Sequence, residues 1–187
     1  RFPFPSRMNE EQRVEVARKL KEVFLHKSDD EDNFSFIDLK KTGAIDRHVM
    51  VEKHLISPNL AEGKAGSGVI INGKESISIM INEEDHLRIQ CMFPGFQLEQ
   101  AWNLCDSIDD FIEEKLDIAY DKVCGYLTCC PTNVGTGMRA SVMLHLPALT
   151  KAGYISNILE SCSKFGVAVR GVYGEHSESW GDMFQVS

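Results

Sequence analysis

Residues 69–81, which read VIINGKESISIMI, decide the fold. The pair Asn72 and Gly73 stands between two apolar runs, and Asn-Gly is a strong hairpin signal because both central residues of its turn need a positive φ. Isoleucine then recurs at every second position from Ile77 to Ile81, as expected for a strand. The sequence therefore predicts a hairpin of two antiparallel strands, residues 69–71 and residues 76–80, with a turn at Asn72 and Gly73.

Apolar periodicity on either side of this hairpin predicts three helices and three further strands. The helices are expected over residues 9–27, 97–116 and 155–165, and the strands over residues 87–91, 139–146 and 167–170. This order predicts an α+β fold, a mostly antiparallel sheet with helices packed on one face. The other face is expected to carry Glu84, Arg88, Arg139 and His145, which suit ligand binding better than a core. The alternating residues Ala140, Val142, Leu144 and Leu146 are expected to point inward, away from that face.

Composition excludes several classes of protein. The chain has 187 residues, of which 43% are hydrophobic and 26% charged, the mixture of an ordinary globular domain. We find no signal peptide and no apolar run of the ~18 residues that span a bilayer. The net charge of -8 disfavours a general nucleic-acid surface. Six cysteines without metal-ligand spacing are expected as reduced thiols in the cytoplasm.

Three arginines at strand positions, Arg88, Arg139 and Arg170, suit phosphate because a guanidinium is always charged and binds oxygens with a planar fork. Glu84 and Arg88 are expected on one strand, so they point the same way, ~13 Å apart. A carboxylate and a guanidinium at this spacing could hold two ends of one reacting assembly. The alternative is that these residues are exposed charges on a solvated face of the sheet.

A cysteine and a glycine loop follow the second predicted helix. Cys130 precedes the loop of residues 133–137, NVGTG, whose small residues allow backbone N–H groups to approach an anion. The loop is no Walker motif, because no Gly-Lys-Ser/Thr follows, and no dinucleotide fingerprint is present. Cys130 is either a half-buried thiol that packs or a thiolate that helps to hold a cationic substrate.

Three motifs in order resemble the ATP:guanidino phosphotransferase family. Residues 82–88 read NEEDHLR, residues 130–140 read CPTNVGTGMRA and residues 170–176 read RGVYGEH. The resemblance runs from about Val49 to the last residue. It implies the guanidino kinase, or glutamine-synthetase-like, catalytic domain.

The resemblance also predicts how the chain is divided. Residues 1–48 are expected as an N-terminal helical segment and loop, and residues 49–187 as a partial catalytic domain, together one folded unit incomplete at both ends. The chain begins at Arg1 and lacks the family's early arginine motif and its C-terminal region. We therefore expect a piece of a longer protein, with weak ATP binding and little or no activity of its own.

Within the family, three segments are similar to the bacterial protein-arginine kinases: residues 53–58, residues 78–82 and residues 140–143. The enzymes that act on small guanidino compounds typically carry arginine where this chain has Tyr173. The resemblance therefore implies transfer of the ATP γ-phosphoryl group to arginine side chains in proteins. The alternatives are a phosphagen kinase acting on free arginine or a related guanidino compound, and a catalytically inactive scaffold domain.

The resemblance assigns roles to individual residues. Glu84 and Glu175 would grip the substrate guanidinium, with Glu84 as the base and Cys130 as the thiolate beside it. Arg88, Arg139 and Arg170 would clamp the nucleotide phosphates, and Mg²⁺ would be bound through those phosphates without a protein ligand. The nucleotide contacts implied in this way are His54, Arg88, Arg139, Ala140, Ser141, Val142, Met143, Arg170, Gly171, Val172, Tyr173, Gly174 and Glu175.

The family resemblance also implies partners. These are protein substrates that present arginine, an activator protein, a protease or chaperone system, and a second copy in a homodimer of the full-length protein. No nucleic acid or membrane partner is expected.

Overall fold

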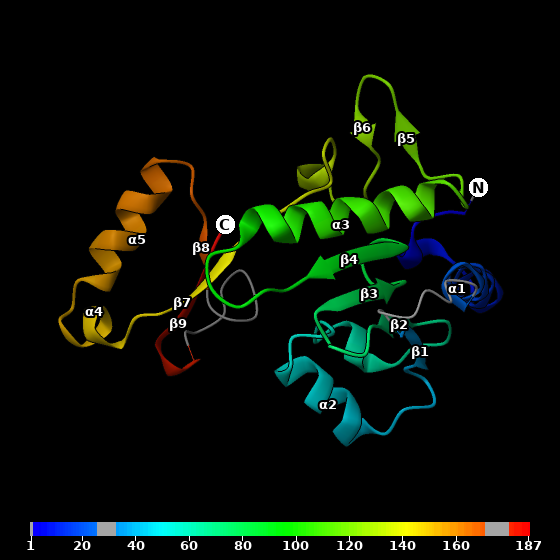
Figure 1. Cartoon of the computed structure of the whole chain (residues 1–187), viewed down its shortest axis with the longest axis horizontal. Helices are drawn as coiled ribbons and strands as arrows, with labels where there is room; N and C mark the ends of the chain where they lie inside the picture. The colour runs from blue at the N-terminus through cyan, green and yellow to red at the C-terminus, as the bar shows by residue number, and fades with distance from the viewer. Residues whose placement is uncertain (1, 26–32, 171–179) are drawn as a thin grey trace. The chain divides into compact units, whose positions relative to one another are not determined.

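The computed structural model describes residues 2–25, 33–170 and 180–187 (Figure 1). The chain forms two compact units, residues 1–138 and residues 139–187. The boundary expected between residues 48 and 49, which would separate the N-terminal segment from the catalytic domain, stays a prediction. In the structure these two residues lie within a helix of the first unit, α2 (Ala44–Glu52). No helix in these described ranges combines the length and apolar character needed to cross a membrane.

Four antiparallel strands form the main sheet of the first unit, in the order β1-β2-β3-β4. They are β1 (Ser35–Asp38), β2 (Gly68–Ile71), β3 (Ile77–Ile81) and β4 (Leu87–Cys91). This arrangement confirms the predicted α+β class and antiparallel sheet.

The hairpin of β2 and β3 is present, but its predicted turn is wrong. Five residues, Asn72 to Ser76, join the strands, and the positive φ falls on Glu75, at 55°, rather than on Asn72 or Gly73. The reason lies in the Asn72 side chain, which accepts the Ile77 N–H at 2.9 Å and donates to the Ser76 hydroxyl at 3.1 Å. These bonds close the five-residue loop around the Asn72 side chain, so the expected turn with positive φ at Asn72 and Gly73 does not form.

One face of this sheet is covered by the two longest helices, α1 (Glu10–Leu25) and α3 (Leu98–Glu113). The helix α1 begins with a reciprocal cap, because the Asn9 side chain accepts the Gln12 N–H at 2.8 Å and Gln12 accepts the Asn9 N–H at 3.1 Å. The core on this side contains the following buried residues: Val16, Leu20, Phe24, Ile70, Ile77, Ile79, Ile81, Ile108 and Ile112.

The opposite face is also covered over β2 and β3, by α2 and the short helix η2 (Leu60–Glu62) with the chain between them. Its core contains Leu39, Leu55, Ile56, Leu60, Val69, Ile71 and Met80. In Figure 1, α3 and α2 lie on opposite sides of the sheet. Because both faces of β2 and β3 are buried, the exposed part of the second face is on β4, where Arg88 pairs with Met80.

The rest of the first unit leads from α3 to Met138. It contains a two-stranded hairpin, β5 (Tyr120–Asp121) with β6 (Gly125–Tyr126), and the short helix η3 (Pro131–Asn133). One further short helix, η1 (Pro5–Arg7), precedes α1.

The second unit has its own sheet, in the order β7-β9-β8. Its elements are β7 (Val142–His145), α4 (Pro147–Lys151), α5 (Ile155–Lys164), β8 (Val169–Arg170), η4 (Trp180–Asp182) and β9 (Met183–Val186). The strand predicted over residues 139–146 begins later, at Val142. Its expected inward row is also wrong, because Ala140 is exposed and Leu144 keeps 38% of its surface.

Candidate active site

The predicted site residues are divided between the two units. His54, Glu84, Arg88 and Cys130 belong to the first unit. The second unit contains the segment from Arg139 to Met143 and the backbone of Arg170. The remaining predicted residues, Gly171, Val172, Tyr173, Gly174 and Glu175, lie outside the described residues.

Glu84 lies on a loop between β3 and β4, not on a strand as predicted. β3 ends at Ile81 because Asn82 takes a left-handed conformation with φ 57°. The buried Asn82 amide then donates to the carbonyl oxygens of Arg13, at 2.9 Å, and Gly66, at 2.8 Å. The spacing of ~13 Å inferred from a shared strand therefore does not apply to Glu84 and Arg88.

The loop of residues 82–86 is held at almost every position. The Asn82 N–H donates to the His86 carbonyl oxygen at 3.0 Å, which closes the loop at its base. His86 Nε2 donates to the Pro3 carbonyl oxygen at 2.8 Å, and Asp85 accepts the Cys129 N–H at 2.6 Å.

Glu84 is the exception in this loop. It is exposed and has no hydrogen bond or ion pair among the described residues. A rigid loop thus presents one free carboxylate, which suits a residue that must bind a cation or accept a proton.

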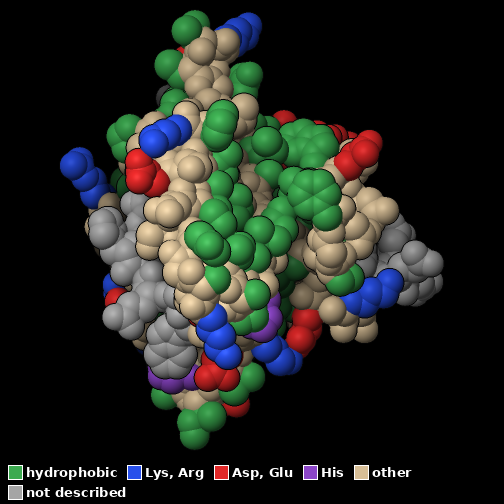
Figure 2. Space-filling model, turned by 90° about the vertical axis from the view of Figure 1, so that its left-hand side faces the viewer, with side chains coloured by type: hydrophobic (Ala, Val, Ile, Leu, Met, Phe, Trp, Pro, Cys, Tyr) green, Lys and Arg blue, Asp and Glu red, His purple; other side chains and the backbone are tan. Residues whose placement is uncertain are grey.

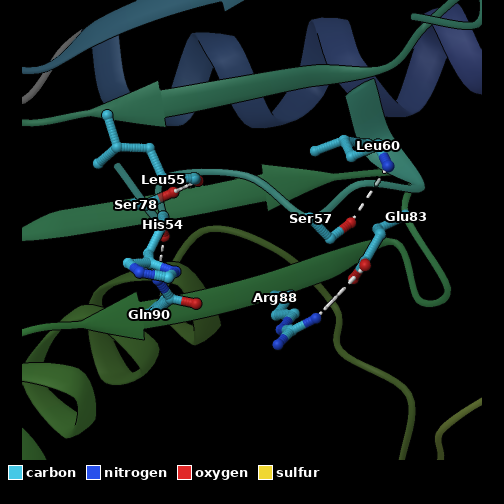
Figure 3. A network of polar contacts seen from close by, with 8 residues as sticks. All are labelled: His54, Leu55, Ser57, Leu60, Ser78, Glu83, Arg88 and Gln90. Carbon is cyan, nitrogen blue, oxygen red and sulfur yellow. Dashed lines mark hydrogen bonds and ion pairs between the residues drawn. The ribbon is translucent and has the colours of Figure 1, made fainter. Parts of the chain in front are cut away.

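Arg88 stands on β4 and is paired with the residue next to Glu84. Its Nη1 lies 3.1 Å from a carboxylate oxygen of Glu83, whose side chain is only 8% exposed (Figure 3). The guanidinium itself is half in solvent, and among the described residues its Nε and Nη2 groups have no partner. The buried carboxylate therefore directs the guanidinium while leaving donors that fit phosphate oxygens.

His54 is held at the same face of the sheet by two neighbouring strands. It has a positive φ of 58°, which is uncommon for a residue with a side chain. Gln90 of β4 donates to the His54 carbonyl oxygen at 2.6 Å, and the buried Ser78 of β3 donates to the carbonyl oxygen of Leu55 (Figure 3). Strained backbone that neighbours hold in place is typical of functional positions.

Cys130 lies in a loop that is tied back to β6. Tyr126 and Gly135 exchange two backbone hydrogen bonds, of 2.8 and 3.2 Å, and so close the loop at both ends. Within it, the half-buried Cys130 thiol lies 3.0 Å from the Thr132 hydroxyl, and the Thr128 hydroxyl donates to the Cys130 carbonyl oxygen at 2.8 Å. All six cysteines carry free thiols.

The Cys130 loop is further anchored to α3 through Tyr126. The Tyr126 hydroxyl lies 2.8 Å from Asp109 and 2.7 Å from Glu113. The bond to Glu113, partial burial and the bond to Asp109 raise the pKa of Tyr126, so the phenol remains a donor. Partial burial also raises the pKa of Asp109. The hydrogen bond from Tyr126 lowers this pKa, and the negative charge of Glu113 raises it further.

The predicted residues of the second unit have fewer contacts. Arg139 and Ala140 are exposed and precede the first strand, and Ser141 accepts a hydrogen bond from Gln185 at 2.8 Å. Met143 on β7 keeps 38% of its surface. Large apolar side chains of this unit are exposed, and Figure 2 shows hydrophobic side chains gathered on one face of the molecule.

Three residues of the site were missed at the level of sequence: Asn82, Glu83 and Asp85. All three belong to the motif NEEDHLR, but the motif by itself predicted no role for them. Sequence alone does not separate the reactive residue of this motif from the residues that hold its loop in place. The structure does so, since Glu84 alone in residues 82–86 is exposed.

Comparisons with known proteins identify the family of the chain. A model of the ATP:guanido phosphotransferase C-terminal catalytic domain matches residues 15–187. The chain belongs to this family. The protein-arginine kinase of Caldanaerobacter subterraneus subsp. tengcongensis is 52% identical over 187 residues, which cover 100% of this chain and 56% of that protein.

Two further relatives, one curated protein and one solved structure, are also similar to the chain. The protein-arginine kinase of Brevibacillus brevis is 49% identical over 190 residues, with 99% of this chain and 52% of that protein covered. A solved structure of the duplicated taurocyamine kinase from Schistosoma mansoni with bound transition state analog components is 27% identical, with a TM-score of 0.85, and covers 98% of this chain and 26% of that one. The chain thus spans about half the length of the curated relatives it matches.

Proposed function

We propose that the protein to which this chain belongs is a protein-arginine kinase, which transfers the ATP γ-phosphoryl group to arginine side chains of proteins. The observation that carries this proposal is the hydrogen bond between Asp85 and Cys129, which brings the loop of Glu84 next to the loop of Cys130. A free carboxylate beside a thiol forms a fitting site for a guanidinium. Relatives that bear this name, at 46–52% identity, support the choice of substrate.

Glu84 would supply the chemistry that a guanidinium needs. With a pKa above 12, a guanidinium is always protonated and is a poor nucleophile. Glu84 would orient it and accept its proton while the N–P bond forms and the bond from the γ-phosphorus to the β,γ-bridging oxygen breaks, releasing ADP. Glu175, outside the described residues, would be the second carboxylate, and Cys130 would lie beside the cation.

The arginines would hold the phosphates and stabilise charge on the transferring group. Arg88 fits this role because its side chain is anchored through Nη1, while its Nε and Nη2 donors have no partner among the described residues. Arg139 and Arg170 would contribute from the second unit, with His54 and residues 140–143 and 171–175 as further nucleotide contacts. Mg²⁺ would be held by nucleotide phosphates and water, as this cation usually is.

A second candidate function is a kinase that acts on a small guanidino compound, because one solved relative is named a taurocyamine kinase. The taurocyamine kinase from Schistosoma mansoni resembles this chain at 27% identity. Such a kinase would use the same Glu84 and Arg88, so the site geometry does not separate it from a protein kinase. The identities of 46–52% against 27% favour the protein substrate.

The proposal extends to the setting of the whole protein. We propose a cytoplasmic enzyme that acts as a homodimer, with an activator protein and a protease or chaperone system as partners. Kinship alone supports these points.

The test is an assay of the complete protein with ATP and either an unfolded arginine-rich protein or free arginine. We expect acid-labile phosphate on the protein substrate, located on arginine by mass spectrometry. Glu84→Gln should lower the rate by about 10²–10⁴-fold, because the general base is lost. Glu114→Gln, an exposed carboxylate at the end of α3, is the matched control and should leave the rate unchanged.

Other outcomes would contradict the proposal. Phosphorylation of free arginine with none on the protein would assign the chain to the small-molecule kinases. Absence of phosphoarginine from both acceptors, with an unchanged biological effect of Glu84→Gln, would indicate a scaffold.

A further inference from the structure

The loop of residues 82–86 and the loop of residues 127–134 are joined by one side chain. Asp85 Oδ1 accepts the backbone N–H of Cys129 at 2.6 Å, across 44 residues of sequence. In the part of the chain that the structure describes, no other hydrogen bond links these two loops. The other hydrogen bonds described for the Cys130 loop lie within it or at its ends. The Leu127 N–H donates to the Ala119 carbonyl oxygen at 2.8 Å, Tyr126 and Gly135 bond to each other, and the Tyr126 side chain leads to α3.

This bond lies next to both predicted reactive groups. Glu84 precedes Asp85, and Cys130 follows Cys129, so each reactive residue is one peptide unit, about 3.8 Å between Cα atoms, from the bonded pair. A change in the position of Asp85 relative to Cys129 would therefore change the separation of Glu84 and Cys130 almost directly. Asp85 could control that separation because it lies so close along the chain to one of the two reactive residues.

The chemistry of the bond suits a positioning role. A side-chain oxygen accepts the backbone N–H here, and the amide oxygen of an asparagine at the same position could accept it as well. The donor is a backbone group, so the bond fixes the chain path rather than one rotamer. The rest of the Glu84 loop is held by Asn82, which is buried, and by His86. Asp85 thus joins a fixed loop to the loop that presents the thiol.

We propose that Asp85 is a positioning residue that sets the distance between the Glu84 carboxylate and the Cys130 thiol by accepting the Cys129 N–H. The proposal rests on the proposed function for the roles of Glu84 and Cys130. Its structural part, the placement of the thiol, can be tested without any kinase activity. The need is for an acceptor oxygen at one position, not for a negative charge.

The experiment compares three variants of the complete protein. Asp85→Asn keeps an acceptor oxygen at the same place and removes the charge. Asp85→Glu keeps the charge and moves the oxygens by one methylene, and Asp85→Ala removes both. Asp117→Ala, an exposed aspartate without a hydrogen bond among the described residues, is the control.

The first readout is the alkylation rate of Cys130, followed at the level of its peptide by mass spectrometry. We expect Asp85→Asn and Asp117→Ala to stay within about twofold of the parent, and Asp85→Glu and Asp85→Ala to alkylate at least about fivefold faster, because thiol reactivity follows exposure. The Asn and Glu variants suffice if Asp85→Ala does not fold. Equal rates in all variants, or a rate in Asp85→Asn as high as that in Asp85→Glu, would overturn the proposal.

The second readout is the rate of arginine phosphorylation. Asp85→Glu should lower kcat by about 10–100-fold, as expected for misplaced reacting groups, with KM for ATP little changed. Asp85→Asn should retain kcat within about threefold. A parent protein without kinase activity, combined with the expected alkylation pattern, would refute the proposed function but support the positioning role. A loss of kcat in Asp85→Asn equal to that in Asp85→Glu would instead show that the charge matters and refute the proposal.

Discussion

The sheets of the two units differ in how they are buried. In the first unit every residue of β2 and β3 is buried, between one core on the side of α1 and α3 and another on the side of α2. In the second unit three of the four residues of β7 are exposed, and among the described residues the only buried hydrophobic side chain is Phe184. A strand becomes rigid when layers pack on both of its faces.

This difference matters for the predicted site. Glu84, Arg88 and His54 stand on loops and strands that the doubly covered sheet holds in place, with buried Asn82, Glu83 and Ser78 as their supports. Arg139, by contrast, is exposed and has no hydrogen bond or ion pair among the described residues. The first unit therefore presents preorganised groups, whereas the predicted contacts of the second unit have less support.

The largest expected difference between the two sheets comes from removing one aliphatic side chain from each. Ile79→Ala in β3 should lower the free energy of unfolding by about 2–5 kcal/mol, because it leaves a cavity in a closed core. Leu144→Ala in β7 should cost less than about 1 kcal/mol, because that side chain is 38% exposed. Denaturant unfolding of the complete protein measures both.

Hydrogen exchange followed peptide by peptide would assign each loss to its unit. An equal cost for the two substitutions would contradict the comparison and would mean that β7 is covered in the complete protein.

A smaller test removes one serine hydroxyl from each unit. Ser78→Ala should lower the free energy of unfolding by about 1–3 kcal/mol, because the buried carbonyl group of Leu55 loses its donor. Ser141→Ala should cost less than about 1 kcal/mol, since Gln185 can turn to water. Ser78→Ala should also raise KM for ATP, through His54, and a normal KM would separate that residue from nucleotide binding.

The smallest expected effect is a dependence on pH at Asp109. Its pKa is raised in the folded state, so the folded state holds this proton more tightly than the unfolded state. The contribution of Asp109 to stability is therefore greatest below the unfolded pKa of about 3.9 and falls as pH rises through the folded value.

Asp109→Asn, which cannot ionise, provides the measurement. The difference in Tm, parent minus variant, should decrease as pH is raised from about 4 to about 6. Asp117→Asn controls for the loss of one negative charge. A constant difference for Asp109→Asn would show that partial burial does not raise the pKa of this carboxyl.

Much of the first unit could be predicted because its signals are local. The helix predicted over residues 9–27 is found as α1, and the one over residues 97–116 as α3, since the apolar period follows from the geometry of a single helix. The hairpin was also predictable, but its loop was not, because the Asn72 side chain closes a wider loop by bonds to Ser76 and Ile77.

The candidate site was predictable only in part. The motif at residues 82–88 identified the correct segment, but its interpretation as a continuous strand failed at Asn82, whose carbonyl partners lie 69 and 16 residues away in the sequence. The alternation predicted over residues 139–146 failed because it assumed a core on one side of β7. Neither error could be seen without knowing which distant segments meet.

The sequence by itself determined the class of fold, the helices and central strands of the first unit, and the family, because periodicity and motifs depend on residues close together in the chain. The tertiary structure alone decided that Glu84 is the free carboxylate of its loop, that Glu83 directs Arg88, and that Asp85 joins this loop to Cys129. The physical reason is that burial and hydrogen-bond partners depend on which distant segments pack together, and no local pattern encodes them.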